Sequence, residues 1–271
     1  MSYQADLARW FLQLHGGAQP LLLPNPWDAG SARLLASLGF QALATTSSGF
    51  AATLGRLDGH VTREEAIANA GEIVDATDLP VSADLENCYA GDAEGVGDTI
   101  ELALRAGLTG CSIEDFSGEE IYDLDVAVER VAAAAAAAHA GPVHLVLTAR
   151  AETHLHGRDD LDDTIARLQA YGQAGADVLY APGLRSIEDI RTVLAAIDRP
   201  LNVLALPGMP SVDELAAAGV ARISTGGAFA FAALGAVVEA ARELREQGTY
   251  GFWERAKLGS SAVRAAFEEP G

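Results

Sequence analysis

Four segments of the chain repeat one order of residues: an apolar stretch with helical spacing, a glycine, and a short apolar run. The segments are LLASLGFQALATTS, LALRAGLTGCSIED, AYGQAGADVLYAPG and LAAAGVARISTGG. Their glycines, Gly39, Gly107, Gly175 and Gly219, suit the left-handed backbone conformation that ends a helix before a strand. The repeat therefore predicts that helices and strands alternate along the chain.

Eight short apolar runs are predicted to be strands. They cover residues 21–25, 42–47, 81–86, 111–115, 145–150, 178–182, 201–206 and 222–226. Strands that are apolar almost throughout belong to a parallel sheet covered on both faces, and eight strand–helix units in about 250 residues are typical of a closed barrel. We therefore predict an α/β fold, a (β/α)8 TIM barrel, in which residues 1–271 form a single domain. A doubly wound open sheet is the alternative, although no G-x-G-x-x-G motif follows the first strand.

Both ends of the chain extend beyond the eight units. At the N-terminus, Leu7, Phe11 and Leu14 fall at helical spacing together with Trp10, which predicts an extra amphipathic helix. At the C-terminus, residues 249–271 form a helical extension that opens with the aromatic cluster TYGFW. Two interpretations of this extension stay open: it packs on its own barrel, or it contacts another subunit.

Composition excludes several classes of partner and mechanism. Eighteen basic against 38 acidic residues give a net charge of −20, which argues against nucleic acid or an anionic membrane as partner. No apolar run approaches the roughly 20 residues of a membrane span, and two cysteines suit a reducing cytosol. We expect a soluble, cytoplasmic protein with a small-molecule ligand. The only lysine is Lys257, in the C-terminal extension, so a Schiff-base mechanism is not expected.

Acidic side chains gather at the carboxyl ends of the predicted strands, where barrel enzymes carry their chemistry. Because side chains alternate along a strand, Asp84 and Glu86 are expected on one face. Glu114 and Asp115 end the next strand, and Arg150 ends the one after. Several carboxylates in one mouth with a single arginine favour a hard divalent cation with oxygen ligands. Arg150 would then bind a substrate carboxylate in a bidentate fork, or form an ion pair with one of the acids.

An ordered series of motifs along nearly the whole chain resembles the isocitrate lyase/phosphoenolpyruvate mutase superfamily. The motifs are NPWDAGSARLLASLGFQALATTSSG, LGRLDG, SADLE, SIED, TAR, GADVLYAPG, PLNVLALPG and RISTGGA. The resemblance implies a barrel that depends on Mg²⁺, with Mn²⁺ as a substitute. It also implies a homo-oligomer, a dimer or tetramer, in which a C-terminal helix is exchanged between neighbouring subunits.

The resemblance also implies roles for individual residues. Asp84 resembles the direct metal ligand, whereas Glu86, Glu114 and Asp58 resemble residues that hold the waters of the metal. The implied metal set is therefore Asp84, Glu86 and Glu114, and the implied catalytic set is Asp58, Glu86, Glu114 and Arg150. The implied substrate-binding set is Thr46, Ser48, Gly49, Phe50, Asp84, Arg150 and Asn202.

The chain departs from the superfamily in the loop after the fourth strand. Isocitrate and methylisocitrate lyases carry Lys-[Lys/Arg]-Cys-Gly-His there and the phosphonate-cleaving branch carries Lys-Thr-Asn, but this chain has EDFSGEEIYDLD. Cys88 and Cys111 are not expected to replace the missing cysteine. His154 and His156, after the fifth strand, are within reach of the mouth but are expected to be solvated.

Together these features predict a Mg²⁺-dependent carbon–carbon lyase, or a related hydrolase or decarboxylase, that acts on a small 2-oxo or 2-hydroxy carboxylate through a metal-stabilised enolate. Two alternatives stay open. One is an enzyme of the phosphonopyruvate type that acts on a P–C bond, and the other is a protein that binds 2-oxo acids without turnover.

Overall fold

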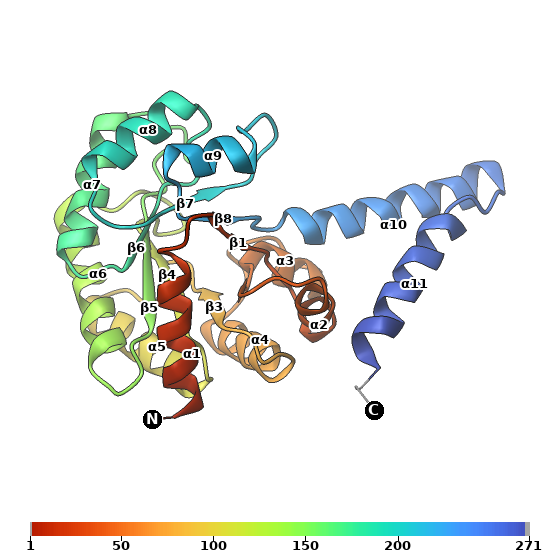
Figure 1. Ribbon diagram of the computed structural model, residues 1–271, viewed down its shortest axis with the longest axis horizontal. Helices are drawn as coiled ribbons and strands as arrows, with labels where there is room; N and C mark the ends of the chain where they lie inside the picture. The colour runs from red at the N-terminus through yellow and green to blue at the C-terminus, as the bar shows by residue number, and fades with distance from the viewer. Residues whose placement is uncertain (1, 269–271) are drawn as a thin grey trace.

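Eight parallel strands form a nearly closed barrel, with helices around it and two further helices projecting away from it (Figure 1). The computed structural model describes residues 2–268. The strands are β1 (Leu21–Leu23), β2 (Leu43–Ala44), β3 (Val81–Asp84), β4 (Gly110–Glu114), β5 (Val146–Arg150), β6 (Val178–Tyr180), β7 (Leu201–Leu204) and β8 (Arg222–Ser224). Their sequential order around the ring confirms the predicted (β/α)8 TIM barrel and excludes a doubly wound sheet, in which the strand order reverses at a switch point.

The helices follow the strands in the predicted alternation. They are α1 (Tyr3–Leu14), α2 (Ala29–Ser37), α3 (Ser47–Thr53), α4 (Arg63–Asp75), α5 (Ala93–Arg105), α6 (Leu124–His139), α7 (Leu161–Gln173), α8 (Ile187–Ala196), α9 (Val212–Ala218), α10 (Ala228–Gln247) and α11 (Trp253–Phe267). The four glycines of the repeat have φ angles of 86° to 109°, so they adopt the predicted left-handed conformation between helix and strand. No helix among residues 2–268 is long and apolar enough to cross a membrane.

Several strands end earlier than their apolar runs predict. The second run, residues 42–47, contains a strand of only two residues, because Ser47 already begins α3. The third strand ends at Asp84, and Glu86 has a φ angle of 49°, outside the extended region. The prediction that Asp84 and Glu86 share a face by strand alternation is therefore wrong at Glu86, because the chain turns away after Asp84.

The predicted N-terminal helix, α1, closes the amino-terminal end of the barrel. Its buried residues are Ala5, Ala8 and Phe11, and Phe11 packs in one cluster with residues that begin β1, β5 and β6. Trp10, which was expected on the same apolar face, is 36% exposed. The remaining seam, between β1 and β2, is bridged by a hydrogen bond from the Ala44 N–H to the Pro24 carbonyl (3.1 Å).

Asn25, two residues after the end of β1, links the ends of three strands at this seam. Its Nδ2 donates to the Thr45 carbonyl beyond β2 (2.8 Å), and its Oδ1 accepts hydrogen bonds from the N–H groups of Thr225 and Gly226 beyond β8 (2.9 Å each). A buried amide that satisfies both neighbours stabilises the closed ring where regular pairing stops. Ring closure then brings the carboxyl ends of all eight strands into one mouth.

Candidate active site

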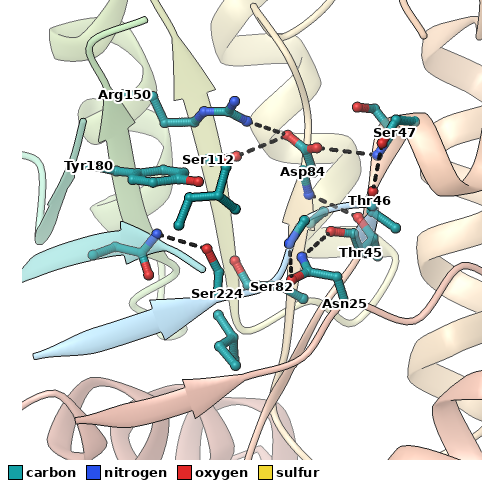
Figure 2. A pocket seen from close by; sticks show the side chains of 18 of the residues that line it. Asn25, Thr45, Thr46, Ser47, Ser82, Asp84, Ser112, Arg150, Tyr180 and Ser224 are labelled. Atoms are coloured by element: carbon teal, nitrogen blue, oxygen red, sulfur yellow. Dashed lines mark hydrogen bonds and ion pairs between the residues drawn. The ribbon is translucent and has the colours of Figure 1, made fainter. Parts of the chain in front are cut away.

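Two connected cavities open at the carboxyl ends of the strands. The inner cavity, of about 180 Å³, lies within the barrel and is drawn in Figure 2. The outer cavity, of about 610 Å³, lies beneath the loops that follow β2 to β5. Ser47, Asp58 and Arg150 line both cavities, so these residues mark the passage between them.

Asp84 ends β3 and points into the inner cavity (Figure 2). Its Oδ1 accepts hydrogen bonds from Arg150 Nη1 (2.8 Å) and Ser112 Oγ (3.4 Å), and its Oδ2 accepts one from the Ser47 N–H (3.2 Å). Its own N–H donates to Thr45 Oγ1 (2.9 Å). Donors from β4, from β5 and from the first residue of α3 therefore fix the position of this carboxylate.

Arg150, at the end of β5, is held by three carboxylates. Its Nη1 lies 2.8 Å from Asp84 and 3.3 Å from Glu114, and its Nε lies 2.7 Å from Glu152. Burial lowers the pKa of Arg150, but these three carboxylates outweigh burial and raise the pKa well above its usual value. Of the two roles predicted for Arg150, the structure contains the ion pair.

Strand register explains this arrangement. Glu114 pairs with Arg150, and Arg150 with Tyr180, so neighbouring strands place these side chains at one level of the barrel. The Arg150 guanidinium carbon lies 5.2 Å from the centre of the Tyr180 ring, within range of a cation–π contact. Asp84, Glu114 and Glu152 together carry more negative charge than one guanidinium neutralises.

Burial and neighbouring carboxylates raise the pKa values of the acids of the outer cavity. Burial, then the charges of Asp84 and Asp58, raise the pKa of Glu86 to about 7, although Tyr89 Oη donates to its carboxylate (3.2 Å). Burial raises the pKa of Glu114 well above its usual value. Asp58 lies at the rim of the mouth and is exposed as a whole residue, but its carboxyl group is partly buried. This burial and the charge of Asp84 raise the pKa of Asp58, whereas a hydrogen bond from Ser47 lowers it. Bringing a cation among these groups would relieve their repulsion.

The donor set fits a Mg²⁺ site built mostly from water. Mg²⁺ binds proteins through one or two carboxylates and keeps several of its waters. Asp84 and Glu114 both reach Arg150 Nη1, and Glu86 and Asp58 line the same mouth. Within residues 2–268 these acids do not form a cluster of three with ligand atoms within 4.8 Å of one another. The mouth therefore offers carboxyl oxygens of four residues to an ion that keeps most of its waters.

Residues 45–50, TTSSGF, which include four of the implied substrate-binding residues, contain the start of a helix. Thr46 is the N-cap of α3, where its Oγ1 accepts a hydrogen bond from the Gly49 N–H (3.3 Å), and both Thr46 and Ser48 line the inner cavity. Gly49 is buried behind them, and a Cβ there would lie 2.6 Å from the Thr46 methyl carbon. Phe50 lines neither cavity and borders only a pocket of about 10 Å³ behind α3. Gly49 and Phe50 thus lie behind the cavity wall.

Asn202 lies at the inner end of the cavity, as part of a buried polar network. Its Nδ2 donates to Ser224 Oγ and its Oδ1 accepts from Arg222 Nε (3.0 Å each). Arg222 also donates to Thr148 Oγ1 (2.9 Å), and burial lowers the pKa of its guanidinium to about 10.

Sequence analysis missed three residues that line the cavities: Arg222, Glu152 and Tyr180. The position of Glu152, two residues after Arg150, could have indicated its role. Arg222 is the first residue of β8, so a search of the carboxyl ends of the strands could not find it.

Asp115 does not belong to the mouth, although the sequence placed it at a strand end. It follows Glu114 by one residue, so it points to the opposite side of β4, where it is buried. Its Oδ2 accepts from Tyr171 Oη (2.6 Å) and Arg167 Nη1 (3.0 Å) of α7. Its carboxylate therefore ties the barrel to its helical layer.

Both cysteines are buried, and burial raises the pKa of Cys88 to about 12 and that of Cys111 well above its usual value. Neither lines the inner or the outer cavity, in agreement with the prediction that they do not replace the missing lyase cysteine. The loop after β4 instead contributes Phe116, whose ring stacks on His156 at 3.6 Å between centres. Both residues line the outer cavity, so His156 reaches the mouth.

Comparison with known proteins places the chain in a family. The family model for phosphoenolpyruvate phosphomutase matches residues 11–245. A crystal structure from Burkholderia cenocepacia, provisionally described as a lyase/mutase, superposes with a TM-score of 0.95 and 49% identity over 99% of this chain and 98% of the other. An oxaloacetate decarboxylase of Chromohalobacter salexigens is 31% identical, over 90% of this chain and 87% of the relative.

A 2-methylisocitrate lyase of Halalkalibacterium halodurans is 29% identical, over 73% of this chain and 67% of the relative. These related proteins are lyases, mutases or decarboxylases that act on small carboxylates. The match covers the barrel, including every strand that lines the two cavities. It also confirms the resemblance seen in the sequence motifs. The chain therefore belongs to the phosphoenolpyruvate phosphomutase family, within the isocitrate lyase/phosphoenolpyruvate mutase superfamily.

Proposed function

We propose that the protein is a Mg²⁺-dependent carbon–carbon lyase, or a closely related decarboxylase or hydrolase, for small 2-oxo or 2-hydroxy carboxylates, with Mn²⁺ as a substitute metal. One observation carries the proposal: Asp84, Glu114 and Glu152 converge on a single guanidinium beside a cavity of about 180 Å³. The excess negative charge calls for a cation, and the cavity size calls for a small ligand. The decarboxylase and lyase relatives support the reaction class.

Asp84 would hold the ion directly, and Glu86, Glu114 and Asp58 would hold its waters. When bound there, the ion withdraws negative charge from an oxygen of the substrate, which favours cleavage of the neighbouring bond. Glu86 lines the outer cavity and its carboxylate accepts a hydrogen bond from Tyr89 Oη (3.2 Å), so it would be held in position to transfer a proton to or from the substrate.

Arg150 would bind the substrate carboxylate. Its Nε is fixed by Glu152, which is only 3% exposed, so the guanidinium keeps its orientation when its other contacts change. Arg150 Nη1 now contacts Asp84 (2.8 Å), the carboxylate that would hold the ion. An ion there would draw on the same oxygens, so N–H groups of Arg150 would become available for the bidentate contact with a substrate carboxylate that arginine favours.

A turnover assay with oxaloacetate, 2-methylisocitrate and phosphonopyruvate, with Mg²⁺ or with a chelator, tests the proposal. We expect Mg²⁺-dependent release of pyruvate or oxalate from a carboxylate substrate, and loss of at least about a hundredfold in rate for Asp84→Asn. Glu94→Gln, an exposed carboxylate in the first turn of α5, is the control and should keep the wild-type rate. Product from phosphonopyruvate alone, or binding without any product, would favour one of the two alternatives instead.

A further inference from the structure

Three potential metal ligands lie together at the opposite end of the barrel from the cavities. His139 is the last residue of α6, His144 lies in the loop before β5, and Asp177 directly precedes β6. His139 Nε2 lies 3.1 Å from Asp177 Oδ2, and His144 Nε2 lies 2.9 Å from Asp177 Oδ1. Their ligand atoms all lie within 4.8 Å of one another. Among residues 2–268, no other three His, Cys, Asp or Glu side chains have ligand atoms this close together.

The cluster is separate from the active site. Asp177 contacts Leu147, near the start of β5, whereas Arg150 ends that strand three residues later, roughly 10 Å away. The acidic residues to which the sequence analysis assigned roles lie at the carboxyl ends of the strands. The proposed reaction does not involve His139, His144 or Asp177. An ion bound here would therefore not replace the ion proposed at Asp84.

The carboxylate of the cluster is rigidly placed. Asp177 Oδ2 accepts a hydrogen bond from the Leu147 N–H (2.9 Å), and the Asp177 N–H donates to the Leu147 carbonyl (2.9 Å). The two imidazole rings are also ordered relative to each other, since they stack at 4.0 Å between centres with planes only 4° apart. Because both rings present Nε2 to one fixed carboxylate, little rearrangement is needed to bring three ligand atoms around an ion.

The distances suit a tetrahedral ion. Zinc–nitrogen distances of about 2.0–2.1 Å imply ligand atoms roughly 3.3 Å apart in a tetrahedron. The two present contacts run to different oxygens of Asp177, His139 to Oδ2 (3.1 Å) and His144 to Oδ1 (2.9 Å), and each is a few tenths of an ångström short of that spacing. One ligand atom from each of the three residues already lies within 4.8 Å of the other two, so small shifts of the rings toward one oxygen bring them to the tetrahedral spacing. The His144 side chain is 44% exposed and that of His139 27% exposed, so an ion can enter and a water can complete its coordination.

We propose that His139, His144 and Asp177 form a second metal site, which binds Zn²⁺ or a similar divalent transition metal through two imidazole Nε2 atoms, one carboxylate oxygen and a water. Two imidazoles favour such ions, whereas Mg²⁺ favours oxygen ligands. Each Nε2 now lies at hydrogen-bond distance from Asp177. In the metal-bound state each Nε2 would instead coordinate the ion through its lone pair, and the proton of each neutral ring would be on Nδ1. The site joins the end of α6 to the starts of β5 and β6 and therefore stabilises the amino-terminal face of the barrel.

Metal competition on the full-length, metal-stripped protein tests this site. Zinc is titrated against a chromogenic chelator in excess Mg²⁺, which occupies oxygen-ligand sites. We expect one zinc per chain for the wild type, and binding at least about tenfold weaker for His139→Asn and for His144→Asn. His60→Asn is the control, because His60 is an exposed histidine whose ring contacts only a backbone carbonyl, and it should bind zinc as the wild type does.

Two further measurements separate metal binding from a purely structural hydrogen-bond cluster. Co²⁺ in place of zinc should give the intense visible absorption of a tetrahedral site in the wild type and in Asp84→Asn, but not in His139→Asn. Zinc should raise the melting temperature of the wild type and leave that of the folded His139→Asn variant unchanged. Wild-type zinc binding equal to that of the histidine variants, or no zinc retained against the chelator, would overturn the proposal, whatever reaction the active site performs.

Discussion

At the scale of single residues, the pairing of His15 with Arg222 links stability to pH. Arg222 can only donate, so its Nη1 requires an acceptor at His15 Nε2 (3.2 Å), while His15 Nδ1 donates to the Phe11 carbonyl (2.9 Å). The ring is therefore neutral. Burial, and then the charge of Arg222, lower its pKa to about 3. In the unfolded chain the pKa returns to about 6.5, so only the unfolded state takes up this proton between pH 6.5 and 3.

The resulting stability is fully present above pH 6.5 and is lost as pH falls toward 3, by about 1.4 kcal/mol per pH unit. Between pH 7.5 and 5, His15 should thus lower the free energy of unfolding by about 2 kcal/mol. His15→Gln, which cannot titrate, should be less stable at pH 7.5 but lose about 2 kcal/mol less over this range. Urea unfolding at both pH values measures the difference, and parallel pH profiles for the two proteins would contradict the assignment.

At the scale of elements, one buried ion pair connects β4 to α7. Arg167 Nη1 contacts Asp115 (3.0 Å) and its Nε contacts Asp163 (3.0 Å), with the Arg167 side chain only 3% exposed. Removing the arginine leaves the Asp115 carboxylate buried with fewer donors. We expect Arg167→Met to lower the free energy of unfolding by about 3–5 kcal/mol. Asp115 Oδ1 also accepts the Glu152 N–H (2.8 Å), so the support behind Arg150 should loosen as well.

The matched control for this prediction is Arg158→Met. Arg158 pairs with the same Asp163 at 3.3 Å, but its side chain is 51% exposed. A pair so exposed is worth at most about 1 kcal/mol. Chemical denaturation of both variants measures the contrast. Equal losses in the two variants would mean that burial does not set the strength of this ion pair.

At the scale of the whole molecule, α10 and α11 form an arm that leaves the barrel as a helical hairpin (Figure 1). Glu243 braces its turn by accepting hydrogen bonds from Thr249 and Phe252, and the end of α11 contacts α2. Yet α11 buries no residue, and large apolar side chains of the arm remain exposed: Phe229, Phe231, Leu234, Val237, Val238, Leu244, Tyr250, Trp253, Leu258, Val263 and Phe267. An apolar surface of this extent is a liability unless something covers it.

We predict that a second copy of the chain covers the arm, as the family resemblance implies, so that the full-length protein is a homo-oligomer. Folding and association are then hard to separate. Deleting residues 249–271 should give insoluble protein or a destabilised species of lower order; Glu269, Pro270 and Gly271 of this segment lie outside the described residues. Sedimentation measures the assembly, and a monodisperse full-length monomer in dilute solution would refute the prediction.

A point substitution refines this test. Leu258→Glu places a charge on the arm, where Leu258 is 73% exposed, and should weaken association at least about tenfold. Val126→Glu is the control, because Val126 is also exposed, at 44%, but lies on α6, away from the arm. Loss of assembly in both variants would point to a general effect of charge instead.

The sequence by itself determined the type and order of the elements. Apolar periodicity and glycines such as Gly107 are local signals, because they reflect backbone conformation and burial within a few residues. The strand ends that carry Asp84, Glu114 and Arg150 followed from that order, since parallel strands of a barrel present their carboxyl ends together. The family resemblance then supplied roles that no local pattern could specify.

Only the tertiary structure decided which side chains meet. Register between β4 and β5 places Glu114 against Arg150, and the turn after Asp84 gives Glu86 a left-handed conformation that strand alternation does not predict. Asp115 points away from the barrel interior, because it follows Glu114 by one residue and neighbouring side chains lie on opposite faces of a strand. His139 and Asp177 are 38 residues apart in the chain, and only the packing of α6 against the starts of β5 and β6 joins them. Such contacts depend on geometry between elements, which patterns within one element do not contain.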